Sequence, residues 1–323
     1  IHKQHAHLYD ALRALRISGM DMGAGGKKRH HYGLMEKLKG DQPKRSFFQS
    51  GVLGRRQDLS GRSTIVPEPN MGLDEVGLPL PMAMEMYKPF VVRELHKSLG
   101  ISPLKAQKLV LAKDQAAIEA LHRVVADRPI MMKRDPALHK FSIMAFNPRI
   151  VEGKAVKIHP LVTGGFNADF DGDTMALYVP VSQEAVDEAK EKMLPSKNLF
   201  SPTHGGLLPV PGQDSLLGLY QMTAWGKPTK AVKATPTQLV DLLSKGKVNA
   251  SDTFTYKGKQ STVGRVALAL ALPLSMRTNA QLLYDPKFRL SKGSLKKFLS
   301  VVAKKFPDEF PKTVDKWKDY GTH

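Results

Sequence analysis

Residues 167–176 read Asn-Ala-Asp-Phe-Asp-Gly-Asp-Thr-Met-Ala, and this stretch carries the strongest chemical signal in the chain. Its three carboxylates, Asp169, Asp171 and Asp173, stand at every second position, so an extended backbone projects all three to one side. Three hard oxygen donors at this spacing suit Mg²⁺, whereas Zn²⁺ is disfavoured without cysteine or histidine nearby. Gly172 allows the tight backbone that brings two of the carboxylates together. The stretch therefore predicts a magnesium site on a loop.

Two alternatives compete with a magnesium site. An EF-hand calcium loop starting at Asp169 needs glycine at its sixth position and glutamate at its twelfth, but Thr174 and Pro180 stand there. The second alternative is an acidic turn that binds no ion. The apolar β-like runs on both sides of the loop argue against this turn, because they place the carboxylates on a buried scaffold.

The composition is that of a globular protein that binds a polyanion. The 323 residues are 41% hydrophobic and 24% charged, which excludes wholesale disorder and a fibre and suggests roughly two domains. With 49 Lys and Arg against 30 Asp and Glu, the net charge is +19. The chain has no cysteine, which excludes a disulfide scaffold, a thiolate zinc site and a cysteine nucleophile.

The ends and the hydropathy of the chain bear on where it acts. No apolar run reaches the length of about 18 residues that a membrane span needs, and no signal peptide is visible, so we expect a cytoplasmic chain without membrane contact. The first residue, Ile1, is not an initiator methionine. We therefore expect either processing or a piece of a longer chain.

The hydrophobic pattern predicts an α+β fold. Ser102 before Pro103, and Ser182, are placed to cap the N-termini of helices. No internal repeat is visible in the sequence. β-like runs lie at residues 60–69, 130–132, 141–146, 150–152, 156–158, 174–179 and 207–210. Helices are expected over residues 5–17, 79–127, 182–193, 215–223, 239–244 and 292–305.

The stretch beginning at Asn167 resembles the signature of the largest catalytic subunit of multisubunit DNA-dependent RNA polymerases, called β′ in bacteria. Further motifs follow the family's order. Leu-Gly-Arg-Arg-Gln-Asp-Leu-Ser-Gly-Arg-Ser at residues 53–63 resembles the switch segment, and residues 77–90 resemble the helical dock. Other matching motifs are residues 133–139, 159–161, 201–202, 211–214 and 218–220, and more weakly 261–265. The resemblance covers residues 1–270, with departures at Lys133, Thr174 and Gly212.

This resemblance implies a fold and a division into regions. The fold is a double-psi β-barrel catalytic core with inserted and flanking helical segments. The implied regions are residues 1–50, a clamp-exit helix and rudder-like basic loop; 51–70, the switch segment and first barrel strand; 71–127, a helical dock insertion; 128–225, the barrel with its catalytic loop; and 226–323, a pore- or funnel-like mixed helical region.

The resemblance also implies an activity, which is nucleotidyl transfer from NTPs to the RNA 3′ end on a DNA template, performed only with partner subunits. Asp169, Asp171 and Asp173 are the implied catalytic residues and hold one Mg²⁺, while a second Mg²⁺ arrives with the NTP. Arg134 and Asn167 are implied to bind the ribose hydroxyls of the substrate. Pairing of the arginine with its neighbour Asp135 or with an active-site aspartate is the alternative for that residue.

Six basic residues are implied to bind nucleic acid. They are Arg55, Arg56 and Arg62 in the switch segment, and Lys27, Lys28 and Arg29 in the position of the rudder, a loop beside the RNA–DNA hybrid. The switch arginines are expected on template phosphates, because a polymerase must bind its template without reading the sequence. A solvated basic face is the alternative for the arginines, and an unstructured basic loop is the alternative for residues 27–29.

The family's zinc-binding cysteines, clamp coiled coil, bridge helix and trigger loop have no counterpart in these residues. We therefore expect the middle of a β′ subunit, either a split subunit such as large phages encode or a piece of a longer bacterial chain. The implied partners are a β-type subunit with a second barrel, the remaining β′ segments, template DNA, the RNA–DNA hybrid, NTPs and an initiation factor. Two other functions remain open: an RNA-templated polymerase of the two-barrel type, and a non-catalytic nucleic-acid-binding barrel.

Overall fold

A computed structural model describes residues 2–16, 20–22, 29–31, 34, 38, 57–225 and 231–322 of the chain. The chain divides into two compact units, Ile1–Asp58 and Leu59–His323, which are described separately.

The first unit contains a helix and a hairpin. Helix α1 (His2–Arg16) confirms the helix predicted over residues 5–17, and β1 (Met20–Met22) pairs antiparallel with β2 (Arg29–His31). Lys27, Lys28, Arg55 and Arg56 lie outside the described residues, and Arg29 is described by its backbone in β2 alone.

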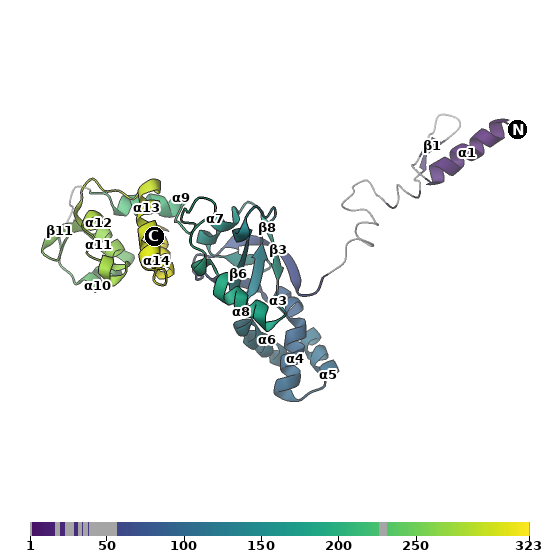
Figure 1. Ribbon diagram of the computed structural model, residues 1–323, viewed down its shortest axis with the longest axis horizontal. Coiled ribbons are helices and arrows are strands. Elements are labelled where there is room, and N and C mark those ends of the chain that lie inside the picture. Colours follow the sequence, from purple (N-terminus) through teal and green to yellow (C-terminus); the bar gives the residue numbers. More distant parts are fainter. Residues whose placement is uncertain are drawn as a thin grey trace. The chain divides into compact units, whose positions relative to one another are not determined.

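Six strands of the second unit close into a barrel, in the order β3-β7-β4-β6-β5-β8. Their bounds are β3 (Ser60–Pro67), β4 (Glu75–Pro79), β5 (Ile130–Lys133), β6 (Ile143–Val151), β7 (Val156–Ile158) and β8 (Thr174–Tyr178). Figure 1 labels three of them, β3, β6 and β8. The long strands β3 and β6 each change partner halfway along. The first half of β3 runs antiparallel to β8 and its second half parallel to β7, while β6 pairs in the same way with β5 and then β4. The pairing of β3-β4-β5 is thus repeated in β6-β7-β8, which confirms the predicted double-psi barrel.

Each half of the barrel carries an insertion before its last strand. Between β4 and β5 the insertion is a bundle of helices, α3 (Leu80–Met86), α4 (Lys88–Leu99), α5 (Pro103–Ala112) and α6 (Gln115–Asp127). The equivalent place between β7 and β8 contains the 3₁₀ turn η4 (Pro160–Val162) and the short helix α7 (Thr163–Phe166). Residues 167–173 follow and carry the three aspartates; we call them the aspartate loop. The three aspartates therefore lie at one end of the barrel, directly before the first residue of β8.

Apolar side chains at alternate positions of the strands form the core of the barrel. Ile130 and Met132 of β5, and Met175 and Leu177 of β8, are almost fully buried, and the side chains between them are partly exposed. Strand side chains alternate between two faces, so each strand delivers every second residue to the core. Burying such side chains supplies most of the stabilisation, at about 1.5–3 kcal/mol each.

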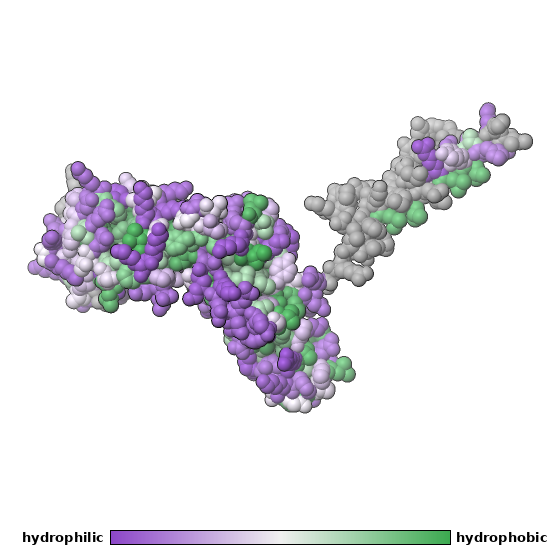
Figure 2. All heavy atoms as spheres, viewed as in Figure 1, coloured by the Kyte–Doolittle hydropathy of each residue, from purple (hydrophilic) through white to green (hydrophobic). Residues whose placement is uncertain are grey.

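The predicted helix caps are present. The Oγ atoms of Ser102 and Ser182 accept the backbone N–H groups of Lys105 at 3.4 Å and Ala185 at 3.2 Å, at the starts of α5 and α8 (Gln183–Lys192). Hydrophilic side chains cover the visible face of α8 (Figure 2). Among the residues that the structure describes, no helix is both long enough and apolar enough to cross a membrane.

The structure corrects three predicted strands. The runs at residues 141–146 and 150–152 belong mainly to one strand, β6, because the polar break at Asn147 marks a change of partner rather than an end. Strand β4 was not predicted. Residues 207–210 do not form a strand; Leu207 makes an isolated bridge to Phe200.

Beyond the barrel the chain continues as helices and a small sheet. The predicted helices over residues 215–223, 239–244 and 292–305 are present, but the sheet β11-β10-β9 and three other helices were missed. The elements are α9 (Gln213–Met222), β9 (Ala231–Val232), α10 (Pro236–Ser244), β10 (Thr253–Tyr256), β11 (Lys259–Thr262), α11 (Val263–Leu270), α12 (Ala280–Tyr284), α13 (Lys292–Lys305) and α14 (Phe310–Thr322). The 3₁₀ turns η3 (Lys140–Ser142), η5 (Pro195–Lys197) and η6 (Leu274–Met276) complete the second unit.

Arg265 organises this C-terminal part. Its side chain is fully buried, and its guanidinium donates five hydrogen bonds, of 2.7–3.2 Å, to the carbonyl oxygens of Thr223, Leu282, Asp285 and Phe288. Burial lowers the pKa of Arg265 to about 10. The arginine thus joins α11 to the end of α9, to α12 and to the loop after α12. All five of its N–H donors are satisfied, so no polar group of the side chain is left unpaired.

Helices α9 and α14 approach each other through two glycines. A Cβ atom on Gly218 would lie 2.0 Å from the carbonyl oxygen of Gly321, closer than any side chain allows. We expect Gly218→Ala to lower the free energy of unfolding by about 1–3 kcal/mol or more, because the helices must separate. Differential scanning calorimetry measures the change.

Gly293→Ala is the matched control for this prediction. Gly293 lies in helix α13, where a Cβ atom would meet nothing within 4 Å. The substitution should be neutral or stabilising by up to about 1 kcal/mol. Equal unfolding midpoints for the two variants would contradict the close packing of α9 on α14.

Candidate active site

The aspartate loop is fixed at both ends. Before it, Phe166 is buried and stacks on Phe146 of β6 with the ring centroids 6.0 Å apart, and the N–H of Ala168 donates to the carbonyl of Thr163. After it, the carbonyl of Asp173 accepts the N–H of Ile65 on β3 at 3.1 Å. The barrel core therefore determines where the loop begins and ends.

Gly172 gives the loop its tight turn. Its φ is +116°, a region that residues with a side chain rarely adopt, although a Cβ atom there would meet nothing within 4 Å. The glycine is therefore needed for its backbone conformation and not for space, as the sequence predicted.

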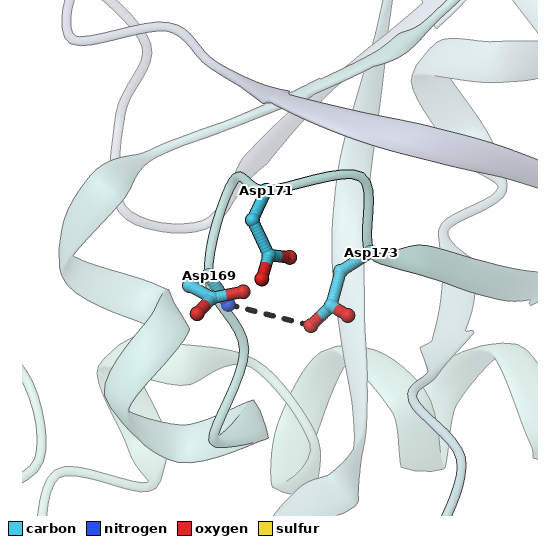
Figure 3. A group of neighbouring side chains, drawn as sticks. All are labelled: Asp169, Asp171 and Asp173. Carbon is cyan, nitrogen blue, oxygen red and sulfur yellow. Dashed lines mark hydrogen bonds between the residues drawn. The ribbon is translucent and has the colours of Figure 1, made fainter.

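The three aspartates converge on one side of this turn (Figure 3). One carboxylate oxygen from each of Asp169, Asp171 and Asp173 lies within 4.8 Å of the other two. Oxygens bound to an octahedral Mg²⁺ ion at 2.0–2.1 Å are separated by about 2.9 Å when adjacent and about 4.2 Å when opposite. Two of the side chains are exposed and the third is half-buried, so small rotations suffice to bring the donors to that geometry. The donor set and its arrangement fit a hard divalent cation.

The electrostatics of the loop also favour a cation. A hydrogen bond and repulsion from Asp169 raise the pKa of Asp171 above its usual value, with smaller contributions from burial and from Asp173. The backbone N–H of Asp169 donates to Oδ2 of Asp173 at 3.4 Å. Carboxylates this close repel one another, and a divalent ion that binds all three relieves the repulsion.

Arg134, the residue directly after strand β5, joins this group. Its Nε donates to Oδ2 of Asp173 at 2.9 Å, and this bond holds the pKa of the aspartate below its usual value. The neighbouring Asp135 pairs instead with Lys133, whose Nζ lies 2.8 Å from Oδ1. Of the two pairings considered for Arg134, the structure thus contains the one with an active-site aspartate.

Arg62 and Asn167 also lie beside the triad. Nε of Arg62, an exposed residue of β3, donates to Oγ1 of Thr174 at 3.1 Å. The hydrogen bond from Lys133, with a smaller contribution from the charge of Arg62, holds the pKa of Asp135 below its usual value. Asn167 is exposed at the start of the loop, in a left-handed conformation with φ of +49°. The structure therefore places five of the implied site residues, the three aspartates with Arg134 and Asn167, in one region with Arg62. The side chains of the other five basic residues lie outside the described part of the chain.

Sequence reasoning missed the part that Lys133 plays. The sequence marked this residue only as a departure from the family, but its ion pair keeps Asp135 from competing for Arg134. The signal that could have found it is the spacing of the opposite charges Lys133 and Asp135, which stand two positions apart and so lie on the same side of an extended chain.

The triad lies on an open surface. A cavity of about 700 Å³ between η5 and the α13–α14 connection, and another of about 500 Å³ beside α7 and α9, include none of the three aspartates among their lining residues. Asp169 and Asp171 are themselves exposed, so a substrate held at the triad by this unit alone would be open to solvent on their side.

The closed double-psi barrel and its three convergent aspartates lie within the part of the chain that matches a known protein family. Residues 54–99 and 101–194 match the family of RNA polymerase Rpb1, domain 2.

Individual relatives extend the match. The chain is 38% identical over 301 residues to the DNA-directed RNA polymerase subunit beta' of Sulfurihydrogenibium sp. (strain YO3AOP1), covering 89% of the chain and 18% of that protein. It is 43% identical over 226 residues to the same subunit of Campylobacter fetus subsp. fetus (strain 82-40), covering 69% of the chain and 15% of the relative. For Aliarcobacter butzleri (strain RM4018) the identity is 37% over 293 residues, covering 86% and 19%. The chain therefore belongs to the family of β′ subunits of RNA polymerase, and it spans less than a fifth of the length of these curated relatives.

Proposed function

We propose that this chain is the catalytic part of a multisubunit DNA-dependent RNA polymerase, which adds nucleotides from NTPs to the RNA 3′ end. The observation that carries the proposal is the convergence of Asp169, Asp171 and Asp173 at the mouth of a barrel of the Rpb1 domain 2 family. Phosphoryl-transfer enzymes work mainly by positioning and by neutralising charge, and a cluster of carboxylates on a rigid scaffold is suited to hold the necessary metal.

The residues of the site divide the work between them. Asp169, Asp171 and Asp173 would hold one Mg²⁺, and a second would enter with the NTP. When bound, the metal supplies charge neutralisation at the transferred phosphate and lowers the pKa of the attacking hydroxyl. Arg134 and Asn167 would orient the ribose by hydrogen bonds, since a guanidinium offers a fork of donors and an amide both donates and accepts.

The surrounding regions would serve the same enzyme. We assign residues 1–50 to a clamp-exit helix and rudder, 51–70 to the switch segment, 71–127 to the dock, 128–225 to the catalytic barrel and 226–323 to a pore or funnel region. A β-type subunit with a second barrel, further β′ segments, an initiation factor and nucleic acid are the proposed partners. The complex would act in the cytoplasm of a bacterium or of a phage-infected host.

A template-exchange experiment tests the proposal. The complex that co-purifies with the chain is given Mg²⁺, NTPs and a primer annealed to either a DNA or an RNA template. We expect Mg²⁺-dependent extension on DNA. Extension on RNA templates alone would favour the RNA-templated polymerase, and binding of both templates without extension would favour a non-catalytic barrel.

Arg62→Ala tests the proposed contact with the template backbone. We expect weaker DNA binding by the assembled enzyme without a change in sequence preference, because a phosphate contact carries no sequence information. The slope of log affinity against log salt should fall by about 0.7–0.9 for each phosphate that the variant no longer neutralises. Arg123→Ala on α6, which removes the same charge from a surface pair with Glu94, is the control. Equal slopes for the parent and the Arg62 variant would contradict the proposed phosphate binding.

A further inference from the structure

A buried polar cluster joins the last helix of the chain to the barrel. We call it the His159 cluster; it consists of His159, Asp315 and Lys318. The histidine is fully buried at the junction between β7 and η4, and its Nδ1 accepts the N–H of Leu161 at 3.0 Å. Since Nδ1 is an acceptor, the neutral ring carries its proton on Nε2, which donates to Oδ1 of Asp315 on α14 at 2.9 Å.

Lys318 completes the cluster from the same helix. Its ammonium group is almost fully buried and donates to Oδ1 of Asp315 at 3.0 Å, to Asp319 at 2.9 Å and to the carbonyl of Pro69 after β3. Its Nζ also lies 3.4 Å from Nε2 of His159, so the lysine is a second contact between α14 and the histidine. Burial raises the pKa of Asp315, but the bonds from His159 and Lys318 outweigh it and hold this pKa below its usual value. A buried lysine is stabilised only when it is paired and hydrogen-bonded, and these partners meet that need.

Hydrogen bonds between near neighbours hold the segment that runs from His159 to the aspartate loop. The N–H of Val162 donates to the carbonyl of His159 at 3.1 Å, and Oγ1 of Thr163 donates to the carbonyl of Pro160 at 2.8 Å. The N–H of Ala168 then donates to the carbonyl of Thr163 at 3.1 Å, just before the first aspartate. Local hydrogen bonds therefore connect the histidine to the aspartate loop through η4 and α7.

Helix α14 is also anchored independently of this cluster. Nε1 of Trp317 donates to the carbonyl of Leu268 at 3.1 Å, and its ring stacks on Phe298 with the centroids 5.5 Å apart. The helix therefore has a fixed place against α11 and α13, and it offers His159 a rigid support. The same anchoring means that the link to His159 can be cut while the helix stays folded.

We propose that helix α14 is a positioning element for the aspartate loop and acts through the His159 cluster. The three residues touch neither the triad nor a substrate site, so they are positioning residues and not catalytic ones. As far as metal affinity is concerned, the inference rests on the proposed function. In this view α14 helps to set the position of the aspartate loop, although it does not contact the triad.

The test uses the full chain and three variants. Asp315→Ala removes the carboxylate that bonds to Nε2 of His159 and leaves only the longer approach of Lys318 to that atom, whereas Asp315→Asn keeps a neutral acceptor for the histidine and the lysine. Asp319→Ala is the matched control, since this acid on the same helix pairs with Lys318 but has no bond to His159. Hydrogen exchange is measured by mass spectrometry over residues 160–173 and over the rest of the chain, and Mn²⁺ affinity by electron paramagnetic resonance.

For Asp315→Ala we expect faster exchange confined to residues 160–173 and a loss of Mn²⁺ affinity of about threefold to tenfold. Removing an outer partner of a metal ligand costs about 10–100-fold, and this cluster lies one step further out. The Asp315→Asn variant should recover the parental values, and Asp319→Ala should keep them. A purely structural role would instead raise exchange throughout the second unit.

A double variant, Asp315→Ala with Lys318→Met, keeps the test decisive if the single one does not fold, because it leaves no unpaired buried charge. Parental exchange over residues 160–173 in the folded variants would overturn the inference. If the parent chain shows no Mn²⁺ binding that Asp171→Asn abolishes, the proposed metal site fails. In that case the exchange measurements alone still decide whether α14 positions the loop.

Discussion

A polymerase assembled with the Asp171→Ala variant of this chain is expected to make no detectable RNA while keeping the subunit composition of the parent. Asp171 is exposed at the tip of the loop, and its carboxylate is one of three that converge within 4.8 Å. Its side chain contributes nothing to the barrel core, so the fold and the assembly should survive. Loss of one preorganised group that stabilises transition-state charge already costs about 10²–10³ in rate. Loss of a ligand to the metal should cost at least as much.

Primer extension and gel filtration measure these two properties. Glu188→Ala is the control, because Glu188 is an exposed acid of α8 that forms only a surface pair with Lys192. Such pairs contribute little to stability, so this variant should behave like the parent. RNA synthesis by the Asp171→Ala enzyme within tenfold of the control, at millimolar Mg²⁺, would contradict the assigned role of the triad.

A second large effect is expected when the 323 residues are tested without partners, because they should incorporate no nucleotide. Asp169 and Asp171 are exposed, and neither of the two cavities described above includes the triad. A triphosphate bound there would have one wall and full access to water. Correct positioning can account for about 7–11 kcal/mol of a reaction barrier, and an open half-site forfeits most of it.

Incorporation of radiolabelled nucleotide into a primed template is measured for the purified chain, with and without the proteins that co-purify with it. We expect activity only in their presence. Robust synthesis by the isolated chain would overturn the proposal of a site shared between subunits. It would point instead to a polymerase that is complete within one chain.

The part of the site that could be predicted from the sequence is the part that is local in the sequence. Three aspartates at alternate positions and one glycine define the loop, and spacing alone shows that their side chains can meet. The φ of +116° at Gly172 and the convergence of the carboxylates confirm that reasoning. The caps at Ser102 and Ser182 were predictable for the same reason, since each bond spans three residues.

Contacts between distant segments were beyond the reach of such patterns. Arg134 meets Asp173 across 39 positions and His159 meets Asp315 across 156, and no periodicity links either pair. The barrel itself shows the same limit. Strand β4 has few alternating residues and is defined by its pairing with β6 and β7. The gap between the predicted runs 141–146 and 150–152 is a change of partner within β6. Tertiary pairing decided these features.

The most direct measurement for the central claim is the position of a divalent ion in the assembled enzyme. Crystals grown with Mn²⁺ in place of Mg²⁺ give an anomalous signal that locates the metal without reference to activity. The account predicts one peak within coordination distance of Asp169, Asp171 and Asp173, and its loss in the Asp171→Asn variant. A triad that carries no anomalous peak at millimolar Mn²⁺ would contradict it.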